Sequence, residues 1–141
     1  MKRFMYDILL KWKDNRDRKP MIIEGIRQCG KTWILKHFGE AEFKDIAYFN
    51  FEYDDRLHKI FEGDLNVSRI IKDLGILRNK SIQPGTTILI LDEIQICPRA
   101  ITSLKYFYEN LSELHVAAAG SLVGVAIAQI GKNVSFPVGK V

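Results

Sequence analysis

The feature that most constrains this chain is the glycine-bounded octapeptide GIRQCGKT, which occupies Gly25–Thr32. It matches the pattern G-x-x-x-x-G-K-[ST]. The apolar run Met21–Ile23 before it indicates a buried strand, and Lys31–Phe38 after it favours a helix that we expect Gly39 to close. Because the N–H groups of such a loop converge at the positive end of the following helix, the segment predicts a phosphate-binding turn.

Within this loop the residue types suit a nucleotide. Gly25 and Gly30 permit backbone torsions and close approaches that a Cβ would block. Lys31 is predicted to reach the β- and γ-phosphates and to assist catalysis, and the Thr32 hydroxyl to ligate Mg²⁺. Arg27 either adds positive charge near the phosphates or points to solvent. We assign to ATP binding Gly25, Ile26, Arg27, Gln28, Cys29, Gly30, Lys31, Thr32 and Trp33.

A second segment places two carboxylates at the end of the apolar run Ile88–Leu91. Asp92 is predicted to hold Mg²⁺ through water, as the aspartate at this position of P-loop proteins does. Glu93 then stands where it can polarise the attacking water as a general base. The alternative is that Glu93 is only a solvated acid. The adjacent pair favours hydrolysis and argues against a small-molecule kinase, which positions a substrate hydroxyl instead.

Ser121 is the third catalytic candidate, because it follows the apolar run His115–Ala119 and Gly120. Its hydroxyl either contacts the γ-phosphate or the water, or caps the helix expected to run from there to about Gln129. Both readings stay open.

Several other residues favour structural interpretations. Arg99 could act on a neighbouring subunit's nucleotide, but a surface arginine near a helix start is the simpler interpretation. The residues 48–52 are better explained as an alternating strand than as a nucleic-acid stacking surface. Trp12 and Trp33 are assigned to core packing, and the three histidines share no metal-ligand spacing: His37, His58 and His115.

Strands alternate with helices along the whole chain, which predicts an α/β class with a parallel sheet. An amphipathic helix over about 3–14 precedes a nucleotide-binding core over about 20–141, and one domain spans 1–141. A further helix is expected from Pro98, with Ile101, Leu104, Tyr108 and Leu111 on its apolar face. Four strands are predicted: Met21–Glu24, Ile46–Phe51, Thr87–Leu91 and His115–Ala119.

The composition and charge of the chain limit which partners and which compartment we expect. The chain has 141 residues, a net charge of +4 and scattered basic residues, so it permits nucleic-acid contact without arguing for it. No apolar run is long enough to cross a bilayer, and the first residues lack the apolar core of a secretory signal. Of the two cysteines, Cys29 lies inside the glycine loop and Cys97 has no ligand spacing. We therefore expect a cytoplasmic protein without a membrane partner.

Taken together, these motifs resemble prokaryotic AAA-type ATP-binding proteins. The resemblance covers residues 6 to 141, and the segments that carry it are GIRQCGKTWILKHFG, AYFNFE, LDEIQICP, SLKYFYE, AAAGSL and SFPVGKV. GxRQxGKT together with LDEIQ is specific to this group. Cys29 departs from it, because a small aliphatic residue is common there.

This resemblance implies a three-layer α/β/α P-loop NTPase of the AAA/ASCE type, with strand order 5-1-4-3-2. Members of the group continue into a further strand, a helical part and a C-terminal domain like restriction endonucleases. We therefore expect a core cut short, with strand five missing or only a stub near Pro137, an open apolar edge that invites self-association, and weak hydrolysis. The whole protein is predicted to act on a nucleic acid or protein partner through that C-terminal domain, the alternative being a slow nucleotide-dependent switch.

Overall fold

The computed structural model describes residues 2–25, 30–121 and 138–140. Helices and strands alternate along this part of the chain, with one short 3-10 helix, η1, after the third strand. The elements are α1 (Lys2–Asp14), β1 (Met21–Gly25), α2 (Lys31–Glu42), β2 (Asp45–Asn50), α3 (Asp55–Ile60), α4 (Val67–Arg78), β3 (Thr87–Asp92), η1 (Ile94–Ile96), α5 (Pro98–Asn110), β4 (His115–Ser121) and β5 (Val138–Lys140).

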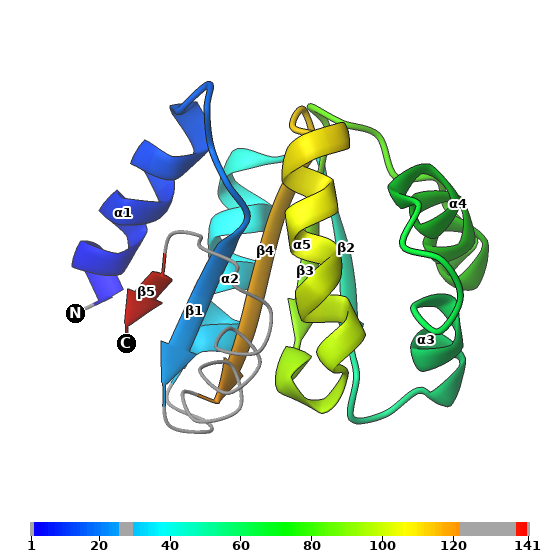
Figure 1. Cartoon of the computed structure of the whole chain (residues 1–141). Helices are drawn as coiled ribbons and strands as arrows, with labels where there is room; N and C mark the ends of the chain where they lie inside the picture. The colour runs from blue at the N-terminus through cyan, green and yellow to red at the C-terminus, as the bar shows by residue number, and fades with distance from the viewer. Residues whose placement is uncertain (1, 26–29, 122–137, 141) are drawn as a thin grey trace.

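The strands form one parallel sheet in the order β2-β3-β4-β1-β5, which confirms the predicted order. β3 lies inside the sheet and is buried at every position, as its continuous apolar sequence predicts. β5 is three residues long and pairs with Ile22, Ile23 and Glu24 of β1. The strand-five stub expected from the sequence is therefore the element that covers the outer edge of β1 (Figure 1).

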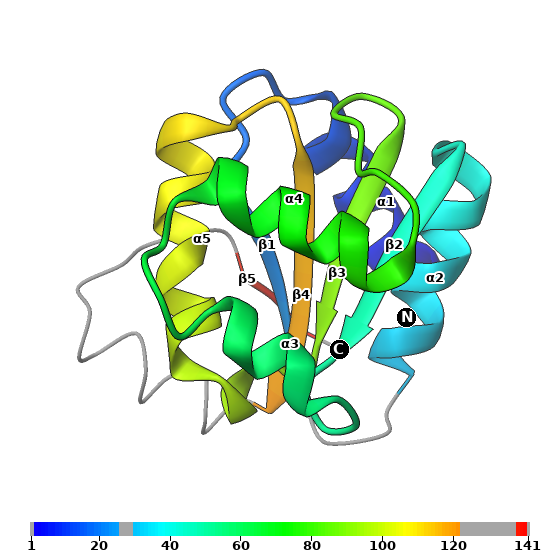
Figure 2. The same cartoon turned by 90° about the vertical axis from the view of Figure 1, so that its right-hand side faces the viewer.

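Helices cover both faces of the sheet, which gives the predicted three layers (Figures 1 and 2). Alternate strand residues face opposite sides, so that Leu89 and Leu91 join one core cluster while Ile88 and Ile90 join the other. The first cluster is completed by α3, α4 and α5, and the second by α1 and α2. Both faces of the sheet are thus sealed, and the strand ends carry the polar chemistry.

At two helix starts, a side chain just before the helix caps its first turn. The Asp54 side chain accepts a hydrogen bond from the Arg56 N–H at the start of α3, and the Asn66 side chain accepts one from the Arg69 N–H at the start of α4. These are N-caps, which satisfy backbone donors that a helix start leaves without partners.

The prediction that Gly39 ends α2 is wrong, because the helix continues through Gly39 to Glu42. A Cβ on Gly39 would lie 2.9 Å from the Cδ1 atom of Ile46 and 3.2 Å from Cγ2 of Ile88. This glycine therefore lets the helix approach the sheet closely, which is a packing requirement and no helix stop.

The apolar face of α5 also differs from the prediction. Phe107 is buried beside Ile101 and Leu104, whereas Tyr108 turns away and its hydroxyl donates to Asp17. The residues after Ser121 that were expected to form a helix lie outside the described residues. β4 itself runs two residues further than predicted, to Ser121.

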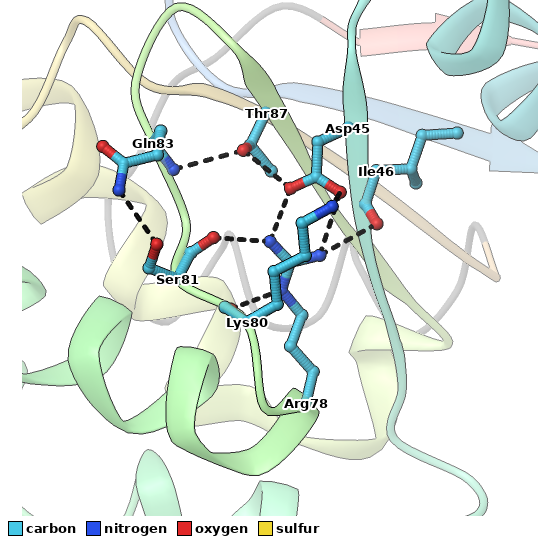
Figure 3. A network of polar contacts seen from close by, with 7 residues as sticks. All are labelled: Asp45, Ile46, Arg78, Lys80, Ser81, Gln83 and Thr87. Atoms are coloured by element: carbon cyan, nitrogen blue, oxygen red, sulfur yellow. Dashed lines mark hydrogen bonds and ion pairs between the residues drawn. The ribbon is translucent and has the colours of Figure 1, made fainter.

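A network of polar contacts fastens the end of α4 to the amino ends of β2 and β3 (Figure 3). The Asp45 carboxylate accepts hydrogen bonds from Arg78 at 2.6 Å, from Lys80 at 3.1 Å and from the Thr87 hydroxyl at 2.9 Å. Arg78 also donates to three backbone carbonyls, those of Ile46, Lys80 and Ser81. We call these residues the Asp45 clamp. It lies at the end of the sheet opposite the glycine-loop junction.

Candidate functional site

Gly30, directly before α2, has the backbone conformation that the glycine pattern predicts. Gly30 adopts φ +87°, a left-handed conformation that residues with a Cβ rarely take. Its carbonyl accepts from the Ile34 N–H at 2.9 Å and starts the helix. Gly25 is the last residue of β1, and Lys31 is the first of α2. The positive end of α2 therefore lies at the carboxyl end of the parallel sheet.

Ile26, Arg27, Gln28 and Cys29 lie outside the described residues, and of Lys31 only the backbone is described. Their assignment to phosphate binding stays a prediction from the sequence.

Thr32 and Asp92 come together across sixty residues of sequence separation. The Thr32 hydroxyl donates to Oδ2 of Asp92 at 2.7 Å. Asp92 is only 2% exposed, and its Oδ1 accepts from the Glu93 N–H at 2.9 Å. The two residues predicted to hold Mg²⁺ are thus adjacent, and their hydroxyl and carboxylate oxygens are the hard donors that this cation prefers.

Tyr48 is a member of the site that the sequence analysis missed. Its hydroxyl donates to the same Asp92 Oδ2 at 2.5 Å, and Asn50 donates to the Tyr48 hydroxyl at 3.3 Å. The ammonium of Lys36, on α2, lies 4.0 Å from the centre of the Tyr48 ring. Burial, with the hydrogen bond to Asp92 adding to it, raises the pKa of the Tyr48 hydroxyl well above its usual range. Tyr48 therefore stays a protonated donor.

A signal for Tyr48 was present in the alternation of β2. Ala47 and Phe49 are buried in the core on the α3–α5 side, and Tyr48 therefore faces the α2 side. That is the side on which Ile90 and Asp92 lie. Alternation was predicted correctly, but the register that brings Tyr48 to Asp92 was not.

Glu93 has an unusual backbone for its residue type, with φ +53° and ψ +44°. Among the described residues other than glycine, only Asn79 shares a positive φ, and Asn79 caps α4, where this conformation is ordinary. Glutamate takes it at a cost, and such strain persists only where surrounding contacts enforce it. The sharp turn directs the chain from β3 into η1.

Gln95 links Glu93 with Ser121. Its side-chain nitrogen donates to Oε1 of Glu93 at 2.8 Å, and its side-chain oxygen accepts from the Ser121 N–H at 3.2 Å. Glu93 and Ser121 were singled out from the sequence, whereas Gln95 was assigned no role. Gln95 closes the segment LDEIQ that carries part of the family resemblance, and that segment was the signal that could have found it. The structure thus joins the ends of β3 and β4 through one amide.

The remaining residues considered in the sequence analysis lie outside this site or have structural contacts. Trp33 is 50% exposed, so its assignment to the core is wrong, and its ring stacks on His37 at 4.9 Å. Trp12 is buried, as predicted. Arg99 donates to the carbonyls of Phe61 and Gly63, which supports the structural interpretation. In the part of the chain that the structure describes, no three metal-binding side chains gather.

A glycine-rich junction from strand to helix, a threonine in the helix's first turn and a buried aspartate at the end of β3 lie on a parallel sheet of order 2-3-4-1-5. This combination defines a P-loop NTPase fold. A family model described as an AAA domain matches residues 17–136, and the chain belongs to that family. A search of curated proteins finds no match. The family supports a nucleotide-binding, ATPase-like function.

Among the described helices, none has the length and apolar character needed to cross a bilayer.

Proposed function

We propose that this chain binds ATP with Mg²⁺ at the carboxyl ends of β1, β3 and β4 and hydrolyses it to ADP and phosphate. The observation that carries the proposal is the 2.7 Å hydrogen bond between Thr32 and the buried Asp92. It unites the end of the glycine loop with the carboxylate pair, two motifs that were separate in the sequence. The AAA family membership of the chain supports the same function.

Each residue's role follows from its chemistry. The backbone of Gly25–Thr32 would cradle the phosphates, and Lys31 would neutralise charge on the β- and γ-phosphates. Trp33 follows this segment and would lie beside the nucleotide. Thr32 and Asp92 would hold Mg²⁺, the threonine directly and the aspartate through water. When bound, this ion supplies neutralisation of the negative charge that develops on the phosphate oxygens.

Hydrolysis needs a base and a defined proton transfer. A water oxygen attacks the γ-phosphorus while the bond from that phosphorus to the β,γ-bridging oxygen breaks, and ADP departs with the bonding electrons. The Glu93 carboxylate takes the water proton, and the products are ADP and inorganic phosphate. Ser121, at the end of β4, would contact the γ-phosphate or the water. We further propose that the energy of hydrolysis is used to act on a nucleic acid or protein partner. Stimulation of ATP turnover by DNA would test the nucleic-acid case.

Two variants test binding and hydrolysis separately. Lys31→Ala should abolish Mg-ATP binding in titration calorimetry, and Lys105→Ala, which changes an exposed lysine on α5, should leave the affinity unchanged. Glu93→Gln should retain ATP while single-turnover hydrolysis falls by a factor of about 10² or more. Unchanged affinity in Lys31→Ala would overturn the phosphate site. Turnover within about twofold of wild type in Glu93→Gln would overturn the base assignment.

A further inference from the structure

The short helix η1 gives Gln95 a fixed position. Ile94 within it is fully buried, and the Ile96 and Cys97 N–H groups donate to the carbonyls of Glu93 and Ile94 at 3.1 and 3.0 Å. The buried neighbour and the backbone hydrogen bonds anchor both sides of Gln95. Its side chain therefore starts from an anchored backbone, and two hydrogen bonds hold the amide at its end.

Both ends of the Gln95 amide are used. The nitrogen donates to Glu93, and the oxygen accepts from the Ser121 N–H. Ser121 in turn pairs in register with Gly25, the first residue of the glycine loop. Gln95 therefore spans from the carboxylate after β3 to the strand that adjoins the loop. The contact described here engages one oxygen of Glu93, Oε1.

We infer that Gln95 is a positioning residue, which holds the Glu93 carboxylate toward the glycine-loop side of the sheet by linking it to the end of β4. This inference rests on the proposed role of Glu93 in hydrolysis. An amide suits the task because it carries a donor and an acceptor on one planar group. Glutamate has the same shape but no donor when ionised, so it would repel Glu93 and also keep an acceptor for Ser121. The left-handed backbone of Glu93 is held by its own N–H, which donates to Asp92, and by its carbonyl, which accepts from the Ile96 N–H.

The decisive variant is Gln95→Glu, measured by single-turnover hydrolysis of Mg-ATP with the 141-residue chain. We expect the hydrolysis rate to fall about tenfold while ATP affinity changes less than twofold, because a misdirected base costs rate without affecting phosphate binding. The matched control is Gln83→Glu, at the opposite end of the sheet, where the exposed Gln83 side chain donates to the Ser81 hydroxyl. It should hydrolyse ATP at the wild-type rate.

A double-mutant cycle separates positioning from general damage. If Gln95 acts through Glu93, Gln95→Glu should have no further effect in a chain that already carries Glu93→Gln. Additive losses would contradict the inference. An unchanged or increased rate in Gln95→Glu, while Glu93→Gln loses turnover, would overturn the role of Gln95 but leave the proposed function intact. If Glu93→Gln retains turnover, or the wild-type chain has none, the proposed function itself fails, together with this inference.

A second measurement does not depend on turnover. In NMR spectra without nucleotide, Glu93→Ala should shift the side-chain amide resonance of Gln95, and Gln95→Ala should shift the backbone amide resonance of Ser121. Both shifts follow from loss of the hydrogen bonds described above. Unperturbed resonances would show that the link is not formed in solution and would overturn the inference.

Discussion

Replacing Asp45 with asparagine should destabilise the fold far more than removing an exposed ion pair. The Asp45 and Arg78 side chains are only 12% and 16% exposed, and Arg78 donates two hydrogen bonds to the carboxylate. Hydrogen bonds to charged groups contribute about 1.5–3 kcal/mol net, and breaking a fully buried pair costs more. Arg78 keeps its three carbonyl acceptors in the variant, and solvent at the rim screens part of the charge. We therefore expect Asp45→Asn to cost about 2 kcal/mol.

Urea denaturation is the appropriate assay. With a denaturant slope of about 1–3 kcal/mol/M for a small protein, that loss should lower the urea midpoint by about 1 M. The matched control is Asp54→Asn, because the Asp54 carboxylate pairs with an Arg56 side chain that is 74% exposed and asparagine still caps α3. The control should show no measurable change. Equal midpoints for the two variants would refute the assignment of stability to the Asp45 clamp.

The stability lost in Asp45→Asn should also depend on pH in a defined way. Hydrogen bonds from Arg78 above all, then from Thr87 and Lys80, hold the pKa of Asp45 well below its usual range. A lowered folded-state pKa means that the stabilisation is complete above the unfolded-state value of about 3.9 and is lost as the pH falls through and below it. The difference in unfolding free energy between wild type and Asp45→Asn should therefore be constant from pH 5 to 8 and shrink below about pH 4. A difference that grows in acid would contradict this reasoning.

Three further predictions each concern a single buried or partly buried side chain. Tyr48→Phe removes the 2.5 Å donor to Asp92 and should cost about 2 kcal/mol of stability in the same urea assay. Burial raises the pKa of the Cys97 thiol, so a thiol reagent should modify Cys29 faster, and ATP should protect Cys29, as mass spectrometry can follow. Burial lowers the pKa of His115, so the unfolded chain binds a proton more readily, and melting temperatures should fall as the pH drops below about 6.5, less steeply in His115→Gln.

Apart from the strand order, which the family resemblance implied, the predicted parts of the fold are those whose information is local. The glycine pattern and the apolar run before Asp92 each lie within a few consecutive residues, and their physics needs no distant partner. The missed features depend on contacts between elements. Gly39 looked like a helix stop because its reason, the approach of Ile46, comes from another element. Likewise, the role proposed for Gln95 depends on β4, which brings Ser121 beside it.

Strand register explains why Tyr48 in particular could not be predicted. The apolar alternation of β2 determines which face each residue takes, but it cannot distinguish two registers that differ by two residues, since both keep Ala47 and Phe49 in the same core. A shift of two residues would move Tyr48 by about 6.6 Å along β3 and away from Asp92.

The polar pairs at the two ends of β2 resolve that ambiguity. Asp45 stands opposite Thr87 in the register and accepts its hydroxyl, while Tyr48 reaches Asp92 diagonally, two positions along from its own partner Ile90. A two-residue shift would break both contacts and leave the Asp92 carboxylate with fewer donors, which is costly for a buried charge. The Asp45 clamp and the Tyr48–Asp92 hydrogen bond therefore favour the same register from opposite ends. The interactions that stabilise the sheet are in this way also those that place a donor beside the carboxylate at the candidate metal site.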